Sequence, residues 1–263
     1  MDQDTFRSTF SMPLGGGYAY PPPPYLYRGV EDLFISYEAD PVAVDALLPP
    51  GVSAADEIPI CIAWARWVPF STFGPYHESY VMIRAVFEGE TYLYQPFIFC
   101  DNEIPLEAGR ELWGYAKKLA HMKHNWSPPT QTFGEQLHFT VERPQDRRIM
   151  TASLHPERLS DPAAQETLPV LSTRFIPHTE AGHAPSVAEL VRLDVDATVN
   201  LSADGTPQLW EGRASLTMDS ASSVDPWHLL APRRITGGWF GRFDFDLVHG
   251  VVVHDYLKDD IWS

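Results

Sequence analysis

The chain has 263 residues, 44 % of them hydrophobic, and a formal net charge of −16 at pH 7. This length allows one large domain or two small ones, with enough apolar side chains for a core. The negative charge argues against nucleic acid and anionic membranes as partners, since both repel an acidic surface. The sequence shows neither a signal peptide nor an apolar run of about 18 residues, so a cytoplasmic protein without membrane contact is expected.

Met1–Pro24 are predicted to form an N-terminal arm without regular structure. The glycines of Gly15–Gly17 and the prolines of Pro21–Pro24 interrupt any periodic pattern. The proline run favours an extended polyproline conformation. The arm would serve either as a linker or as a segment packed on a neighbouring subunit. Residues 25–263 are predicted to be a single domain, because the sequence has no internal repeat and no clear second boundary.

The rest of the chain has mainly the pattern of strands. Leu33–Tyr37 is a predicted strand, and Asp40-Pro41 begins a short helix with a capping residue and a proline at its first position. Ile104–Leu112 is a second short helix, and Glu88-Gly89-Glu90 is a hairpin turn. Because strands predominate, the fold is predicted to be mostly β (α+β), an antiparallel barrel or sandwich with a few short peripheral helices. The other predicted strands are Ile58–Trp67, Glu78–Phe87, Tyr92–Cys100, Glu135–Glu142, Arg148–Leu154, Val187–Leu201, Pro207–Met218 and Leu247–His254.

Cysteine and histidine give no sign of a metal site. Cys61 and Cys100 stand far apart in apolar runs, which is typical of buried thiols. The ten histidines are scattered and form no compact ligand set. Ser220–Ser223, Asp225 and His228 lack the elbow motif of a hydrolase triad, so they are not assigned a catalytic role.

The stretch Gly109–His124, GRELWGYAKKLAHMKH, places two of the four lysines of the chain side by side. Lys117 and Lys118 follow Trp113 and Tyr115. A desolvated lysine loses its proton and attacks a carbonyl as a neutral amine, which arginine cannot do. Neutralising half of a lysine at pH 7 requires about 4.6 kcal/mol, and repulsion between ammoniums about 5 Å apart supplies only about 3 kcal/mol. Desolvation must supply the rest, unless the two lysines are simply a solvated surface pair.

The motif GRELWGYAKKLAHMK resembles the lysine motif of the acetoacetate decarboxylase family. Three further stretches are similar to that family in the expected order: Pro23–Val52, Arg66–Ser79 and Val251–Leu257. The resemblance therefore extends over nearly the whole chain. It implies a β-barrel whose interior forms the pocket, a small keto acid as substrate, no metal or bound cofactor, and a homo-oligomer.

The resemblance also implies a role for four charged residues. Lys117 corresponds to the Schiff-base lysine, and Lys118 to a neighbouring cation that favours the neutral amine. Glu78, in HES, matches a site glutamate that positions substrate or moves a proton. Arg28, in YLYRG, matches an arginine that would orient Glu78 or clamp the substrate carboxylate. Substrate-binding residues are expected at Tyr115, Trp113, Trp64 and Tyr256.

One position departs from the family pattern. The family has a second acidic residue fifteen positions before the glutamate, where this chain has Ala63. The main hypothesis is a Schiff-base lyase that breaks a carbon–carbon bond of a keto acid through Lys117. The Ala63 departure keeps open a lysine-dependent aldolase or dehydratase acting on an α-keto acid such as pyruvate. A third hypothesis is a non-catalytic barrel that binds a small ligand, which predicts no covalent trapping of a carbonyl compound.

Overall fold

A computed structural model describes residues 1–126, 136–218 and 220–259 of the chain. Its helices are α1 (Gln3–Ser8), α2 (Pro41–Asp45), α3 (Glu103–Ala108), the π-helical turn η1 (Gly109–Trp113), and the 3₁₀ turns η2 (Pro162–Ala164), η3 (Trp227–Leu230) and η4 (Tyr256–Lys258). Its strands are β1 (Tyr25–Glu38), β2 (Ser53–Ala54), β3 (Ile60–Val68), β4 (Phe70–Ser71), β5 (Tyr76–Phe87), β6 (Glu90–Cys100), β7 (Lys117–Leu119), β8 (His121–His124), β9 (Leu137–Glu142), β10 (Arg148–Leu159), β11 (Val170–Ile176), β12 (Val187–Leu193), β13 (Thr198–Val199), β14 (Leu209–Thr217), β15 (Arg234–Leu247) and β16 (Val251–Asp255).

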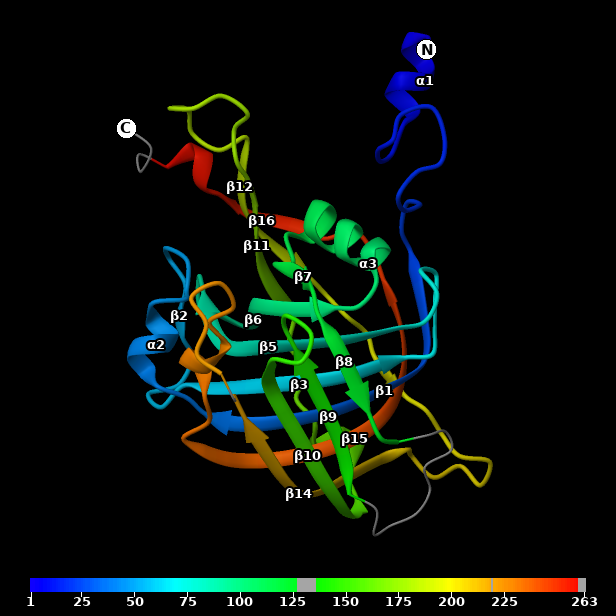
Figure 1. Cartoon of the computed structure of the whole chain (residues 1–263), viewed down its shortest axis with the longest axis vertical. Helices are drawn as coiled ribbons and strands as arrows, with labels where there is room; N and C mark the ends of the chain where they lie inside the picture. The colour runs from blue at the N-terminus through cyan, green and yellow to red at the C-terminus, as the bar shows by residue number, and fades with distance from the viewer. Residues whose placement is uncertain (127–135, 219, 260–263) are drawn as a thin grey trace.

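The strands form one curved, mostly antiparallel sheet (Figure 1). Its strand order is β16-β12-β11-β6-β5-β3-β1-β15-β14-β10-β9-β8, and β7 pairs with β6. The predicted mostly-β class with few short helices is confirmed. The predicted barrel is not confirmed, because this hydrogen-bonded path does not return to its start. The chain bends at Ala120, so that β7 pairs with β6 while β8 pairs with β9.

The two faces of this sheet differ around β7. In the pairing register of β5, β6 and β7, Tyr80 lies opposite Ile98, which lies opposite Lys117. Phe99 and Lys118 are the next residues along these strands, and successive side chains of a strand point to opposite sides. We call the side of Tyr80, Ile98 and Lys117 the lysine face, and the side of Phe99 and Lys118 the opposite face.

Each face is buried by its own hydrophobic cluster. The lysine-face cluster includes Ala108 of α3 and Trp113 of η1, so these helical turns cover that side of the sheet. The cluster on the opposite face includes Phe99 of β6 and Trp227 of η3. A residue on β5, β6 or β7 therefore enters one of two separate environments, depending only on its place in the alternation.

Two local predictions are confirmed in detail. Helix α2 begins where expected, with Asp40 Oδ1 accepting hydrogen bonds from the backbone N–H groups of Val42 and Ala43. The hairpin of β5 and β6 turns at Glu88 and Gly89, whose φ angles of 50° and 83° are left-handed. Glycine adopts such a conformation without steric cost, which explains why the turn falls there.

Several other predictions were wrong or incomplete. The arm contains the short helix α1, which Asp2 caps through the backbone N–H of Thr5. The predicted strand Val187–Leu201 is interrupted between β12 and β13, and β11 and most of β15 were missed. The glycines of β15 obscured its pattern; Gly238 is required there because a Cβ would lie 2.4 Å from the Cβ of Ala214. Glu135, the first residue of another predicted strand, lies outside the described residues.

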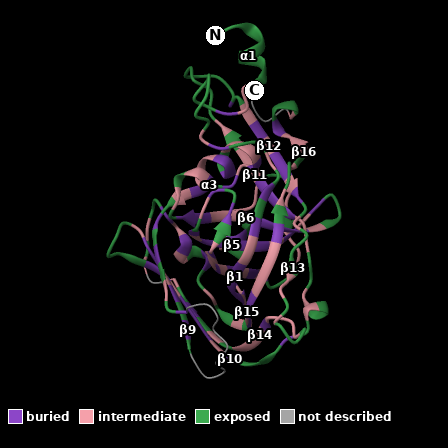
Figure 2. Ribbon diagram, turned by 90° about the vertical axis from the view of Figure 1, so that its right-hand side faces the viewer, coloured by how far each residue is buried: buried purple, intermediate pink, exposed green. Residues whose placement is uncertain are grey.

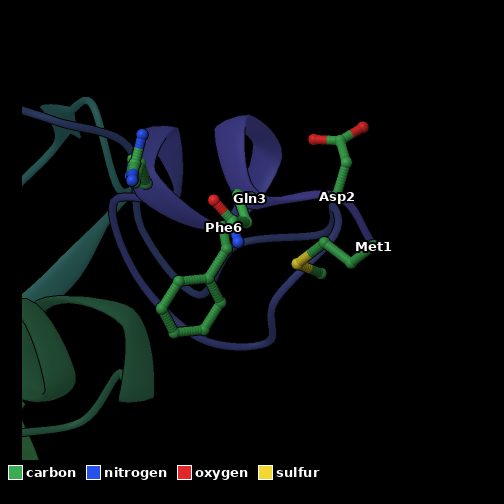
Figure 3. Close-up of a pocket in the computed structure, with 5 residues that line it drawn as sticks. Met1, Asp2, Gln3 and Phe6 are labelled. Atoms are coloured by element: carbon green, nitrogen blue, oxygen red, sulfur yellow. The ribbon is translucent and has the colours of Figure 1, made fainter.

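The N-terminal arm extends away from the sheet (Figure 1) and exposes α1 (Figure 2). It contacts the body of the protein through Tyr20, whose hydroxyl donates a hydrogen bond to Glu111 of η1. A hollow of about 420 Å³ beside α1 (Figure 3) contains none of the predicted site residues; it is lined by Met1, Asp2, Gln3, Phe6 and Arg7. Within the described ranges, no helix is both long and apolar enough to cross a membrane.

Candidate active site

Two of the sequence motifs meet at a buried ion pair. Lys117 lies on β7 and Glu78 on β5, and each residue is only 5 % exposed. The Nζ atom of Lys117 donates a hydrogen bond of 2.5 Å to Oε1 of Glu78. A charged pair this far from water is costly unless each charge is closely satisfied. The structure thus brings together the lysine and the glutamate that the sequence singled out.

The turn before β7 shapes the position of Lys117. The carbonyl of Gly109 accepts a hydrogen bond from the backbone N–H of Tyr115, so the chain folds back beneath η1. A Cβ at Gly109 would lie 2.8 Å from Cε of Lys117, so a larger residue there would displace the lysine side chain from this position. Gly114 ends η1 in the left-handed conformation, with a φ angle of 77°. π-Helical turns of this kind occur frequently at functional sites.

Tyrosine rings surround the amine. The centroids of the Tyr76 and Tyr115 rings lie 5.8 and 5.9 Å from Nζ of Lys117, and the hydroxyls of Tyr27 and Tyr76 are 3.0 Å apart. Burial raises the pKa of all three tyrosines, and the charge of Glu78 raises it further. Their hydroxyls therefore stay protonated at neutral pH and can donate hydrogen bonds. The surroundings are aromatic and dry, as a reactive lysine requires.

Two further charges extend the ion pair into a row across the sheet. Asp32 of β1, Arg66 of β3 and Glu78 lie directly opposite one another in the pairing register. Nε and Nη2 of Arg66 donate to the two carboxylate oxygens of Asp32 at 2.7 Å each. Nη1 of Arg66 lies 3.8 Å from Oε2 of Glu78. Burial alone would lower the pKa of Arg66, but the charge and hydrogen bonds of Asp32, together with the nearby Tyr80 and Glu78, outweigh it and raise that pKa well above the ordinary value.

Sequence reasoning missed both Asp32 and Arg66. Arg66 interrupts the apolar run AWARWV within the predicted strand Ile58–Trp67, and Asp32 directly precedes the predicted strand Leu33–Tyr37. A charged side chain at such a position needs a partner or a function. This was the signal that could have found them, although it does not show that they pair with each other.

Lys118 lies on the opposite face. Its Nζ atom donates to the carbonyl of Val224 at 2.6 Å and to Oδ1 of Asp225 at 2.9 Å, and its side chain is 39 % exposed. Arg143 donates to the other carboxylate oxygen of Asp225. The effect of Lys118 on the charge of Lys117 stays a prediction, and it would have to act across the strand.

The structure does not bring Arg28 to Glu78. Nη1 of Arg28 donates to the carbonyl of Phe245 at 3.0 Å and to Oδ1 of Asp246 at 2.8 Å. The reason lies in β1, whose pairing with β15 shifts register between Tyr27 and Val30 and so redirects this side chain. The arginine beside Glu78 is Arg66.

Two predicted substrate-binding tryptophans are engaged in the core. The indole of Trp113 donates to the carbonyl of Val248 at 3.0 Å. The ring of Trp64 is stacked between Phe34 and Tyr80, with centroids 5.5 and 5.3 Å away. These contacts describe packing, and a role in substrate binding stays a prediction for both.

Tyr256 and Ala63 belong to the cluster on the opposite face. The hydroxyl of Tyr256 donates to the carbonyl of Pro50 at 2.6 Å. Ala63 is 2 % exposed and lies opposite Val81, so an acidic side chain at that position would not point toward Lys117. The alanine therefore carries less information about the reaction than the sequence suggested. Of the four predicted substrate-binding residues, Tyr115 is the one placed beside Lys117.

Both cysteines are buried free thiols, as expected. Burial raises the pKa of Cys61 to about 12 and that of Cys100 to about 11, which keeps both protonated and unreactive at neutral pH. Within the described residues, His, Cys, Asp and Glu side chains form no group of three or more that could hold a metal ion.

Comparison with known proteins identifies the family. The family model for acetoacetate decarboxylase (ADC) matches residues 11–257. The acetoacetate decarboxylase of Ralstonia nicotianae is 31 % identical over 261 residues, which cover 98 % of this chain and 99 % of that protein. The chain therefore belongs to the acetoacetate decarboxylase family and is an enzyme of the decarboxylase or lyase type. This membership does not favour the hypothesis of a non-catalytic binding protein.

Solved structures agree with this assignment. The crystal structure of acetoacetate decarboxylase from Legionella pneumophila has a TM-score of 0.81 and 26 % identity, covering 97 % of this chain and 96 % of that one. The enduracididine biosynthesis enzyme MppR, complexed with pyruvate, has a TM-score of 0.74 and 21 % identity, covering 94 % of this chain and 98 % of that one. At that identity the second likeness shows a shared fold alone.

Proposed function

We propose that Lys117 forms a Schiff base with a small keto acid, and that the resulting iminium is used to break a carbon–carbon bond of the substrate. The observation that carries the proposal is the 2.5 Å hydrogen bond from Nζ of Lys117 to Glu78, buried among tyrosines in a chain of this family. A cytoplasmic location, a homo-oligomer and the division into an arm and a domain at residue 25 remain predictions from the sequence.

The Glu78 contact offers a route to the neutral amine. A proton that moves along this hydrogen bond converts the ion pair into an amine and a carboxylic acid. In water this transfer is uphill by roughly 8 kcal/mol. Burial reduces the cost, because it penalises two charges but not two neutral groups. Glu78 then carries the proton that the reaction needs next.

Each step of the proposed reaction balances. The nitrogen of Lys117 attacks the keto carbon, and the carbonyl oxygen leaves as water with one proton from the amine and one from Glu78. In a β-keto acid, the bond to the carboxyl carbon then breaks. Carbon dioxide departs, and the electron pair flows into the iminium to give a neutral enamine. Protonation of the enamine carbon and hydrolysis release the ketone and restore the lysine.

A second candidate reaction uses the same iminium. With an α-keto acid, loss of a proton from the carbon beside the iminium gives an enamine, whose carbon attacks an aldehyde while the aldehyde oxygen gains a proton. The reverse direction also breaks a carbon–carbon bond. The observation that favours this candidate is the guanidinium of Arg66 beside Glu78, at 3.8 Å.

Borohydride trapping tests the shared iminium. The protein is incubated with acetoacetate, pyruvate or acetone, reduced with borohydride, and weighed intact by mass spectrometry. We expect one adduct per chain, which peptide mapping places on Lys117. The adduct should be absent in Lys117→Ala and present in Lys118→Ala, the matched control from the same strand. Adduct formation on Lys117→Ala equal to that of the wild type would refute the proposal.

A further inference from the structure

The guanidinium of Arg66 is held in a fixed position, but not all of its nitrogen atoms donate hydrogen bonds to the described residues. Nε and Nη2 are both occupied by Asp32, and the guanidinium carbon lies 5.3 Å from the ring centroid of Tyr80 and 5.0 Å from that of Phe245. The side chain is only 14 % exposed. Within the described part of the chain, Nη1 donates no hydrogen bond, since Oε2 of Glu78 at 3.8 Å is too distant for one. A fixed donor thus faces the reacting groups.

We propose that Nη1 of Arg66 binds the carboxylate of the substrate while its keto carbon is joined to Lys117, and that Arg66 thereby determines the substrate class. This inference rests on the proposed Schiff base at Lys117. A guanidinium is the side chain best suited to a planar carboxylate, and its charge does not depend on pH in the physiological range. Arg66 would act as a specificity residue, because it touches the substrate but moves no proton.

The charges near the lysine are compatible with a bound carboxylate. Once the proton has moved from Lys117 to Glu78, as proposed above, the carboxyl group no longer carries a negative charge that would repel the substrate. After water has left, Glu78 is again negative, and it lies next to the positive iminium on Lys117. The substrate carboxylate then faces Arg66, so each negative group on the lysine face has a positive neighbour. The two oxygens of the Glu78 carboxylate lie 2.5 Å from Nζ and 3.8 Å from Nη1, so both nitrogens are close to the same carboxylate.

This placement favours a substrate that keeps its carboxylate. In a decarboxylation, the negative charge leaves the carboxylate and flows toward the iminium in the transition state. A cation at the carboxylate then stabilises the ground state more than the transition state, and the reaction slows. In an aldol reaction the carboxylate keeps its charge throughout, so the same contact binds the substrate without raising the barrier. The inferred substrate class is therefore an α-keto acid.

Paired probes separate the carboxylate from the carbonyl. Pyruvate and methyl pyruvate present a similar keto group, but only pyruvate is charged. Borohydride trapping on Lys117 is measured against the concentration of each, in the wild type and in Arg66→Gln. We expect the concentration of pyruvate for half-maximal trapping to rise by roughly 10- to 100-fold in the variant, as for loss of a hydrogen bond to a charged group. The value for methyl pyruvate should stay within about twofold on the same reasoning.

Further variants distinguish a loss of substrate binding from a loss of folding. Arg66→Gln leaves the buried carboxylate of Asp32 without its partner, which is strongly destabilising in many proteins. The double variant Asp32→Asn, Arg66→Gln removes both charges together, and it should show the same loss of selectivity for pyruvate over the ester. Arg66→Lys retains a charge without the planar geometry and should lie between the wild type and Arg66→Gln. Circular dichroism and thermal melting confirm which variants are folded.

Three results would overturn the inference, and they differ in what else they overturn. Equal losses for pyruvate and methyl pyruvate in folded Arg66 variants would reduce Arg66 to a structural role. Equal trapping of the two probes by the wild type would show that the carboxylate is not recognised, although the adduct on Lys117 would leave the proposed function intact. If none of pyruvate, acetoacetate and acetone is trapped on Lys117, the Schiff base itself fails and the inference fails with it.

Discussion

The two faces of the sheet give neighbouring residues of one strand different surroundings. Lys117 points to the lysine face, where Glu78 and tyrosine rings surround its amine. Lys118, the next residue, points to the opposite face and is bound by Asp225 near solvent. Glu78 is likewise preceded by His77, whose ring contacts Asp101 and His124 on the other side.

The proposed reaction takes place on the lysine face, whereas the polar contacts of the opposite face stabilise the fold. On the lysine face, a row of four alternating charges crosses β1, β3, β5 and β7 among buried aromatic rings. On the opposite face, polar contacts join loops and strand ends, as Asp225 does with Lys118 and Arg143. Successive residues of a strand point to opposite faces. The adjacent residues Lys117 and Lys118 are therefore predicted to have different roles.

The largest effect should come from exchanging each lysine for arginine. Lys117→Arg retains a positive charge but supplies no neutral amine, so we expect turnover to fall by on the order of 10³-fold or more and the borohydride adduct to vanish. Lys118→Arg should stay within about threefold of the wild type, because arginine can still pair with Asp225. The measurements are kcat/KM with the best substrate of the panel and intact mass. A Lys117→Arg enzyme with near-normal turnover would mean that no covalent step occurs.

The next largest effect should follow from a single methyl group at Gly109. This residue has helical dihedral angles, φ −61° and ψ −43°, so alanine fits the backbone without strain. Its Cβ would lie 2.8 Å from Cε of Lys117 and displace the amine from Glu78. Misplacement by about 1 Å can cost roughly 100-fold in rate, and we expect a fall of that order in kcat. A thermal melt close to the wild type would show that the fold survives. Unchanged kcat would show that the lysine has more room than the structure gives it.

Local signals in the sequence predicted a large part of the fold. The cap of α2 and the turn of the β5–β6 hairpin depend on residues close together in the chain, such as Asp40 and Gly89, so they were visible. Helix α1 is a short helix of six residues capped by Asp2, and nothing in its apolar pattern marks it. Whether the sheet closes depends on how strands distant in sequence pair, which local patterns do not encode.

The candidate site was predictable only in part, for a related reason. The lysine motif and HES identified Lys117 and Glu78, which the structure brings together. The pairing of Asp32 with Arg66 depends on the register of β1 against β3, which the sequence does not display. Family resemblance pointed instead to Arg28, but the irregular start of β1 directs that side chain to Asp244 and Asp246.

Substitutions on the opposite face should lower the stability of the protein rather than its activity. Asp225→Asn weakens two ion pairs at once at a side chain that is only 7 % exposed, and we expect a loss of about 1–3 kcal/mol in the free energy of unfolding. Lys118→Ala removes one half-exposed partner and should cost about 0.5–1 kcal/mol. Urea unfolding measures both. Because both side chains lie on the opposite face, we expect neither change to alter the pH dependence of trapping on Lys117, in contrast to the role that the family resemblance implies for Lys118. A shifted pH profile in Lys118→Ala would show that its charge acts across the strand, and the contrast between the faces would then be weaker than the geometry suggests.

The last prediction is a pH dependence of stability centred on His124. Burial, with the neighbouring His77 adding to it, lowers the pKa of His124 from 6.5 to about 4. The folded protein therefore holds this ring neutral, while the unfolded chain takes up a proton as the pH falls below about 6.5. Stability from this residue is complete above that pH and is lost progressively down to about pH 4.

Two titratable groups lie near the ring of His124. Nε2 of His77 is 2.8 Å from Nδ1 of His124, and the ring of His77 is in turn hydrogen-bonded to Asp101. His124→Gln should flatten the fall in urea midpoint between pH 6.5 and pH 4.5 relative to the wild type, whereas His121→Gln, at an exposed position of the same strand, should leave that fall unchanged. Trapping on Lys117 at pH 7 should be the same in both variants, because His124 lies on the opposite face. If His124→Gln reproduces the pH slope of the wild type, carboxylates elsewhere cause that slope. If His124→Gln instead reduces trapping at pH 7, the two faces are coupled through β5, where His77 and Glu78 are adjacent.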